Sequence, residues 1–383
     1  MMKLTPQHPA ICFAQTHSLV VLFVTSVYDN PVSGPATYAR LLHAAFSNAS
    51  FAFITITSDA AQADQRMICV EKTKTPSDIY KRLWKTAKMA VELLPGKKVI
   101  VHFNNAFPYL FFGRLGTKSF IQLNDYMNIE VPYYLRGRYT WKVKLHHIAR
   151  KATEHISVKR TDKLICNSHY TFDKAIEHYR IPKEKCVLIY KSMRLEEMQL
   201  RPPIQPSGSI LYVGNDLYRK GFDILASALG RCKKVTTLHI AGPSFKTDKE
   251  HEFLRMIPKH IKVIQHGSVP SEQLYHIMAQ TDLVVIPARF EALGVSIIEA
   301  LAQGVPVLTS GVGGLKEVLK GYPAVFSDYD NLNSEQLAHN LDLVFTDYSG
   351  YLEQVSSKIN HMRKLFSPVT MTQQLTELYY SET

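Results

Sequence analysis

Residues 282–300 read DLVVIPARFEALGVSIIEA, in which an apolar run leads into a turn and then into a second apolar segment. The run Asp282–Pro287 predicts a buried strand of a parallel sheet, and the segment after the turn predicts a helix packed on that sheet. Glu291 lies in the turn, and Glu299 lies about two helical turns, or 12 Å, further along the axis. The N–H groups of Leu293–Val295 would lie at the helix N-terminus, where anions bind. Two carboxylates beside an anion site indicate a site for a sugar joined to a phosphate; the alternative is an ordinary helix whose acids face solvent.

The length and composition of the chain indicate two α/β domains. Its 383 residues are too many for one ordinary domain, and 46% hydrophobic residues suffice for two cores. No secretory signal is recognisable, and the apolar run at 19–24 is far shorter than the ~20 residues of a membrane span. The cysteines show no paired metal spacing, which predicts free thiols in a reducing, cytoplasmic compartment. They are Cys12, Cys69, Cys166, Cys186 and Cys232.

The positive charge is concentrated in the first half of the chain. Residues 1–200 hold 28 Lys and Arg against 15 Asp and Glu, whereas the remainder holds 17 against 18. A basic half joined to a near-neutral half predicts that one domain faces a polyanionic surface. Membrane phospholipid, an acidic glycan and nucleic acid all fit this charge.

The most basic segment, residues 133–163, carries an apolar pattern of its own. Trp141, Leu145 and Ile148 recur there at helical spacing beside many lysines and arginines. This pattern is typical of a helix that lies on an anionic membrane surface. A solvated helix whose apolar stripe faces the core fits equally well. No nucleic-acid-binding motif accompanies the charges, so nucleic acid is not expected as a partner.

Apolar runs of strand length alternate with helical patterns along the whole chain. This alternation predicts two Rossmann-like domains with mainly parallel sheets that face each other across a cleft. We expect the domains at 1–200 and 209–369, joined by the proline-rich linker 201–208. Gly34, in a turn that feeds a helix, is a candidate for a phosphate-side loop. Polar residues follow the strands of the first domain at the edge where α/β sheets bind ligands: His102, Asn104, Asn105, Asn124 and Asp125.

The second half resembles the donor domain of retaining glycosyltransferases of family 4, which have the GT-B fold. Tyr212-Val213-Gly214 followed by Arg219-Lys220-Gly221 is similar to the family's glycine loop and its diphosphate-binding basic residue. Glu291 and Glu299 match the family's E-x7-E motif, and the residues up to Val307 match its EA-x-A-x-G-x-PV run. Residues 313–318 match a GG-x-x-E-V element. A final helix over 370–383 resembles the tail that packs back on the first domain.

The resemblance implies a nucleotide-sugar donor and assigns roles to matching residues. Arg219 and Lys220 would neutralise the diphosphate, Glu299 would hold the ribose hydroxyls, and Glu291 would contact the transferred sugar. No D-x-D follows a strand, so no metal ion and no cofactor are expected. The expected donor-binding set also contains Gly34, Gly214, Asn215, His266, Gly267, Ala292, Leu293 and Gly294.

The first half resembles the family less closely. His102 aligns with a histidine that faces the reacting sugar, but an alternative register places Asn104 at that position. Asn104, Asn105, Asn124 and Asp125 would lie on the acceptor side. Relatives have an Asn-Gly pair where this chain has Lys191-Ser192.

These features predict a retaining glycosyltransferase that uses a nucleotide sugar, with UDP as the default nucleotide. Its acceptor would be a glycan or glycolipid of cell-surface polysaccharide or lipopolysaccharide synthesis. We expect it in the cytoplasm, peripherally bound to the inner face of the membrane. The alternative is a non-catalytic partner that binds sugar nucleotides or glycans. The E-x7-E stretch argues against an epimerase, and the lack of a pyridoxal-phosphate lysine motif argues against a phosphorylase.

Overall fold

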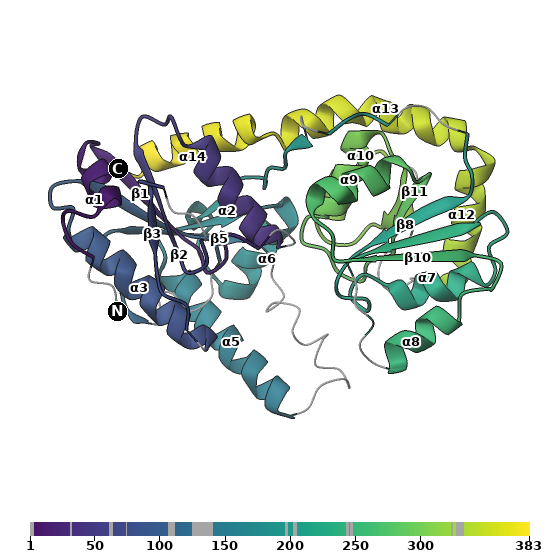
Figure 1. The fold of residues 1–383 in the computed structure, drawn as a ribbon, viewed down its shortest axis with the longest axis horizontal. Helices are drawn as coiled ribbons and strands as arrows, with labels where there is room; N and C mark the ends of the chain where they lie inside the picture. The colour runs from purple at the N-terminus through teal and green to yellow at the C-terminus, as the bar shows by residue number, and fades with distance from the viewer. Residues whose placement is uncertain are drawn as a thin grey trace. The chain divides into compact units, whose positions relative to one another are not determined.

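The computed structural model divides the chain into two units. Unit 1 comprises Met1–Ser192 and Pro368–Thr383, and unit 2 comprises Met193–Ser367. In both units a parallel sheet is covered by helices (Figure 1), so the predicted α/β fold with two mainly parallel sheets is confirmed. The structure describes residues 4–30, 33–60, 64–73, 75–105, 112–124, 141–195, 198–201, 205–242, 245, 248–322, 325–326 and 333–383.

The sheet of unit 1 has seven strands in the order β3-β2-β1-β4-β5-β6-β7, and all of its pairings are parallel. The strands are β1 (Leu19–Val24), β2 (Ala52–Thr57), β3 (Met67–Cys69), β4 (Lys98–Phe103), β5 (Lys118–Leu123), β6 (Lys163–Cys166) and β7 (Cys186–Leu188). Central β1 is an unbroken apolar run that is buried at every position. Such a run is typical of a parallel strand covered on both faces.

Helices cover both faces of this sheet. They are α1 (Pro9–Gln15), α2 (Gly34–Ala45), α3 (Pro76–Glu92), α5 (Trp141–Arg160), α6 (His169–Tyr179) and α14 (Pro368–Ser381). Alternate residues of β1 belong to two separate cores, as the period of a strand requires. Leu19, Val21 and Phe23 share one core with α2 and α14. The C-terminal helix is therefore an integral part of unit 1.

The sheet of unit 2 has six strands in the order β10-β9-β8-β11-β12-β13. The strands are β8 (Ser209–Val213), β9 (Thr237–Ala241), β10 (Lys262–Gly267), β11 (Leu283–Ile286), β12 (Val307–Ser310) and β13 (Val325–Phe326). The helices are α7 (Phe222–Leu229), α8 (Asp248–Arg255), α9 (Ser271–Ala279), α10 (Val295–Gln303), α11 (Leu315–Val318), α12 (Ser334–Thr346) and α13 (Tyr348–Leu365). Helix α10 contacts α9 and α13, while α7 contacts α8 and α12, which forms two helical layers (Figure 1).

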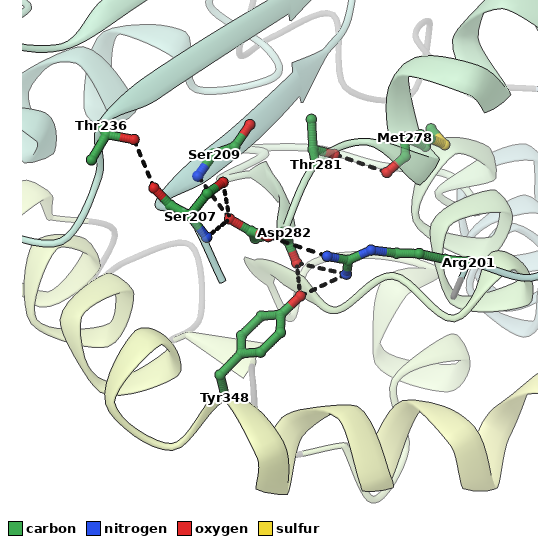
Figure 2. A network of polar contacts seen from close by, with 8 residues as sticks. All are labelled: Arg201, Ser207, Ser209, Thr236, Met278, Thr281, Asp282 and Tyr348. Carbon is green, nitrogen blue, oxygen red and sulfur yellow. Dashed lines mark hydrogen bonds and ion pairs between the residues drawn. The ribbon is translucent and has the colours of Figure 1, made fainter. Parts of the chain in front are cut away.

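The segment 201–208, predicted as a linker, belongs to unit 2 instead. Its first residue, Arg201, is buried and donates from Nη2 to Asp282 Oδ1 at 3.2 Å and from Nη1 to the Tyr348 hydroxyl at 2.6 Å (Figure 2). The N–H of Ser207 donates to Asp282 Oδ2 at 2.8 Å. Arg201 and Ser207 are thus held at the start of β11.

Two further observations concern the described part of the chain. No helix within it is long and apolar enough to span a bilayer. All five cysteines are free, and Cys166, Cys186 and Cys232 are buried.

Candidate functional site

The loop that follows β8 brings two cations to the carboxyl edge of the sheet of unit 2. Asp216 shapes the turn, because its Oδ1 accepts from the Arg219 N–H at 3.0 Å and its carbonyl accepts from the Lys220 N–H at 2.9 Å. Gly214 leaves room for the lysine, since a Cβ there would lie 2.8 Å from Lys220 Cγ. At Gly221, where φ is 73°, a Cβ would lie 1.9 Å from a carbonyl oxygen just after β11. Glycine therefore allows the two loops to touch.

Both cations converge on Glu291, which lies in the loop after β11. Lys220 Nζ forms an ion pair with Glu291 Oε2, and Arg219 Nη1 lies 3.6 Å from the same oxygen. The Lys220 side chain is 10% exposed and that of Glu291 is 13% exposed, so solvent screens this pair only weakly. Asp216 Oδ2 lies 3.8 Å from Arg219 Nε, so the group carries two positive and two negative charges.

Burial and pairing act in opposite directions on these two groups. Burial lowers the pKa of Lys220, and the Glu291 carboxylate offsets part of that effect. Burial raises the pKa of Glu291, but Lys220 and Arg219 outweigh it and hold the pKa below its usual value. Glu291 is therefore ionised at neutral pH.

Arg289, which the sequence interpretation missed, connects the two loops. Its guanidinium donates to both carboxylate oxygens of Asp223, at 2.6 and 2.8 Å, and lies 4.0 Å from the centre of the Tyr218 ring. The backbone N–H of Arg289 donates to the backbone carbonyl of Arg219 at 2.8 Å. The bidentate and stacked arginine fixes the loop that presents Lys220. These contacts span 66 or more residues of chain, so no local pattern could have revealed them.

The turn from Glu291 to Gly294 leads into the N-terminus of α10. Gly294 is the cap residue, with φ of 90° and no side chain to cap the helix. A Cβ there would lie 2.3 Å from Leu315 Cδ2, and a Cβ on Gly314 would lie 2.1 Å from the Ala292 carbonyl oxygen. The Gly314 N–H donates to the Glu291 carbonyl at 3.0 Å. Close packing between these two segments thus fixes the turn, including Ala292 and Leu293, at a helix end that suits an anion.

Glu299 lies on α10 and is 8% exposed. Its Oε1 accepts a hydrogen bond at 3.1 Å from the hydroxyl of Tyr275 on α9. Sequence interpretation missed Tyr275, because the two residues are 24 positions apart and lie on different helices.

The remaining predicted donor residues follow the neighbouring strands. His266 and Gly267 are the last two residues of β10. The His266 ring stacks on the ring of His239, and His266 Nε2 lies 2.9 Å from His239 Nδ1. Burial lowers the pKa of both imidazoles. Asn215 lies close to the end of β9, where a Cβ on Gly242 would lie 2.9 Å from Asn215 Oδ1. The structure therefore collects these residues at the same edge as Lys220.

In unit 1 His102, which was predicted to face a reacting sugar, lies in the core. Its side chain is 0% exposed and points into the core that contains α14, where Nδ1 lies 2.7 Å from the Tyr379 hydroxyl. Burial lowers the pKa of His102 to about 3. Strand alternation explains the placement, because position 102 shares a face with Ile100, which lies in the same core.

The asparagines at the strand ends of unit 1 do lie together. Asn104 donates from Nδ2 to Thr25 Oγ1 at 3.0 Å, and Asn124 donates from Nδ2 to Asn104 Oδ1 at 3.1 Å. Within the described residues, Asn124 Oδ1 is buried without a partner. Asn105 lines a small cavity with Tyr80 and Trp84 among others, whereas Asp125 lies outside the described residues.

Gly34 is the first residue of α2, where Ser33 caps the helix. The Gly34 carbonyl accepts from Lys191 Nζ at 3.3 Å, and the same ammonium lies 5.1 Å from the centre of the Tyr38 ring. Lys191 thus places a positive charge beside the start of this helix.

Family models match both halves of the chain. The model "Glycosyltransferase Family 4" matches residues 32–197, and "Glycosyl transferases group 1" matches residues 201–361. An uncharacterized 41.2 kDa protein from the cps region of Klebsiella pneumoniae is 25% identical over 61% of this chain and 66% of its own length. The matched part spans about half to two thirds of the first curated relatives.

Solved structures share the architecture over nearly the whole chain. Anabaena Alr3699/HepE in complex with UDP-glucose has a TM-score of 0.69 at 17% identity, over 94% of this chain and 99% of that one. WaaG, a glycosyltransferase involved in lipopolysaccharide biosynthesis, has a TM-score of 0.67 at 17% identity, over 91% and 97%. At these identities the likeness establishes the fold, which is GT-B.

Proposed function

The chain belongs to the GT-B glycosyltransferases related to family 4, and from this premise we propose that it transfers a sugar from a nucleotide-sugar donor with retention of configuration. The observation that carries the proposal is the convergence of Arg219 and Lys220 on Glu291 beside the N-terminus of α10. Two adjacent cations beside a helix N-terminus suit a diphosphate joined to a hydroxyl-rich sugar.

Each charged group has a proposed role in binding the donor. Arg219 and Lys220 contact the diphosphate, and the N–H groups at the start of α10 add to the same anion site. Glu291 accepts hydrogen bonds from hydroxyls of the transferred sugar while it remains paired with Lys220, because a carboxylate offers about four acceptor positions. Glu299 accepts from the ribose. HepE was solved with UDP-glucose bound, which supports UDP as the first nucleotide to test.

The proposed reaction relies on stabilisation of the leaving group. An acceptor hydroxyl oxygen bonds to the anomeric carbon on the face from which the diphosphate departs. The bond from that carbon to the phosphate oxygen breaks, and the hydroxyl proton passes to the leaving phosphate. Negative charge grows on the diphosphate in the transition state, where Lys220, Arg219 and the helix dipole stabilise it. These fixed charges supply what a metal ion supplies elsewhere, so we propose metal-independent transfer.

We propose that unit 1 binds the acceptor, a glycan or glycolipid of cell-surface polysaccharide or lipopolysaccharide synthesis. The half-buried amides of Asn105 and Asn124 are suited to hydroxyl groups, because an amide both donates and accepts, whereas Asn104 is 1% exposed and holds Asn124 in place. The likeness to WaaG supports lipopolysaccharide as one class of acceptor to test.

We also propose that α5 binds the anionic inner face of the cytoplasmic membrane. Leu145 is 59% exposed and Ile148 is 57% exposed, one turn apart on a helix that carries six lysines and arginines. Further along α5, Val158 is fully buried in the core of unit 1. One half of α5 thus anchors the helix and the other presents apolar side chains among basic residues, as a membrane-surface helix does.

A second candidate function is donor binding without transfer. The observation that favours it is the burial of His102, which removes from the acceptor side the histidine that the family resemblance implied.

Titration calorimetry with UDP, GDP, ADP and CMP sugars, followed by transfer to a glycolipid extract, tests both functions. We expect Lys220→Ala and Glu299→Ala to lower donor affinity, and the exposed-lysine control Lys233→Ala to leave it unchanged. Donor binding with transfer supports the enzyme, and binding without transfer to any extract supports the second candidate. Unchanged affinity in both site variants contradicts the assignment.

A further inference from the structure

Tyr275 lies in the middle of α9 and is half-buried against α10. Its hydroxyl donates to Glu299 Oε1 at 3.1 Å. We propose that Tyr275 is a positioning residue for ribose recognition, which sets the orientation of the Glu299 carboxylate before the nucleotide arrives. This inference rests on the proposed function, because it assigns Glu299 to the ribose.

A second contact fixes Tyr275 to the same helix. Gln303, one turn after Glu299 on α10, donates from Nε2 to the Tyr275 carbonyl at 3.1 Å. Gln303 is 2% exposed, and its backbone carbonyl accepts a hydrogen bond from the backbone N–H of Arg201 at 2.8 Å. The backbone and the side chain of Tyr275 are thus both attached to α10, so the phenol approaches the carboxylate from a fixed direction.

The chemistry of a phenol suits this task. A buried carboxylate must be hydrogen-bonded, and Glu299 is 8% exposed. A neutral hydroxyl orients one oxygen without cancelling the negative charge, and a carboxylate with about four acceptor positions retains capacity for ribose hydroxyls. Glu291 differs, because two cations hold it. Glu299 thus has a neutral hydroxyl among its partners, which suits a site for a neutral diol.

Pre-orientation predicts a specific signature in nucleotide affinity. Without the hydroxyl of Tyr275, Glu299 must be ordered when the nucleotide binds, which weakens the bonds to ribose but not those to the phosphates. We expect Tyr275→Phe to weaken a ribonucleoside diphosphate about tenfold, typical of one hydrogen bond to a charged group. The 2′-deoxy form, which lacks one of the hydroxyls concerned, loses less.

Calorimetry of the full chain with UDP, GDP and ADP, each paired with its 2′-deoxy form, measures this signature. The variants are Tyr275→Phe, Glu299→Ala and, as a matched control, Tyr351→Phe, a half-buried tyrosine on α13. We expect Tyr275→Phe to reduce the ratio of the ribonucleotide affinity to the 2′-deoxynucleotide affinity without changing the thermal unfolding temperature. The control Tyr351→Phe should keep the wild-type ratio.

Two sets of results would overturn the inference. If Tyr275→Phe weakens ribo and deoxy forms equally, or neither of them, while Glu299→Ala lowers the ribo affinity, then Tyr275 does not position Glu299 although the proposed function stands. If no nucleotide binds, or Glu299→Ala binds them as the wild type does, the proposed function fails and the inference with it.

Discussion

Lys220 and Glu291 are 71 positions apart in the chain and form a buried ion pair at the carboxyl edge of the sheet of unit 2. Arg219 lies 3.6 Å from the same carboxylate oxygen, so the glutamate meets two cations. Loss of Lys220 leaves Glu291 with Arg219 as its nearby cation, whereas loss of Glu291 leaves the two cations with Asp216 alone, 3.8 Å from Arg219 Nε.

The first prediction concerns this asymmetry. Removal of one partner of a buried ion pair typically costs about 3 kcal/mol. We expect Glu291→Gln to destabilise unit 2 by about that amount, because two adjacent cations then repel each other, and Lys220→Met to cost less, because Arg219 still pairs with the carboxylate. Hydrogen exchange of unit 2 amides measures both. A nucleoside diphosphate should restore the stability of unit 2 more in Glu291→Gln than in Lys220→Met, because it replaces the missing negative charge. Equal gains in stability for the two variants would contradict the pairing.

The second prediction concerns the buried network around Asp282, which accepts from Ser207 and pairs with Arg201 (Figure 2). We expect Asp282→Asn to lower the free energy of unfolding of unit 2 by about 3 kcal/mol, because it leaves the buried guanidinium without a charge partner. The network lies at the starts of β8 and β11, whereas the proposed donor site lies at their ends. Nucleotide affinity of the folded variant should therefore match the wild type, and Glu252→Gln, at an exposed position on α8, serves as the stability control.

The third prediction is a pH dependence of unit 1. Burial lowers the pKa of His102 from 6.5 to about 3, so the unfolded chain binds a proton below pH 6.5 that the folded chain does not bind. The stability contributed by this residue is complete above pH 6.5 and falls by about 1.4 kcal/mol per pH unit on acidification towards pH 3.

His102→Gln retains a hydrogen-bonding side chain but cannot titrate, so its stability should fall less steeply between pH 6.5 and 5 than that of the wild type. Both tryptophans, Trp84 and Trp141, lie in unit 1, so their fluorescence in urea reports the unfolding of that unit. Parallel pH slopes for the two proteins would contradict the neutral, buried assignment of His102.

The fourth prediction concerns membrane binding by α5. Substitution of Leu145 and Ile148 by serine removes the exposed apolar pair and should lower retention on vesicles of phosphatidylglycerol and phosphatidylcholine by about tenfold or more. Leu343→Ser, at a 45% exposed leucine on α12, is the matched control. Retention should also fall as salt rises, because screening weakens the attraction of basic residues to anionic lipid. Equal retention of the double variant and the control would refute this surface.

Local patterns predicted the elements well where the signal lies within one segment. The stretch 282–300 gives β11 and α10 as expected, because an apolar run and a glycine-capped helix are encoded side by side. The burial of His102 was not visible in the sequence, because its partner Tyr379 lies 277 positions away. Arg289 and Tyr275 escaped notice for the same reason, since their partners lie on other elements. The composition of the segment 201–208 gave no sign that Arg201 and Ser207 contact the buried Asp282.

The order of the two units along the chain has a consequence for biosynthesis. Unit 2 is one continuous segment whose ends meet, since the Met193 N–H donates to the Phe366 carbonyl at 3.0 Å. Its fold therefore needs no residue from outside that segment. Unit 1 begins first but needs Tyr379 and its neighbours on α14 to close its core. The core of unit 1 therefore joins the segments that are synthesised first and last, and because contacts of long sequence separation form slowly, we expect unit 1 to fold more slowly than unit 2.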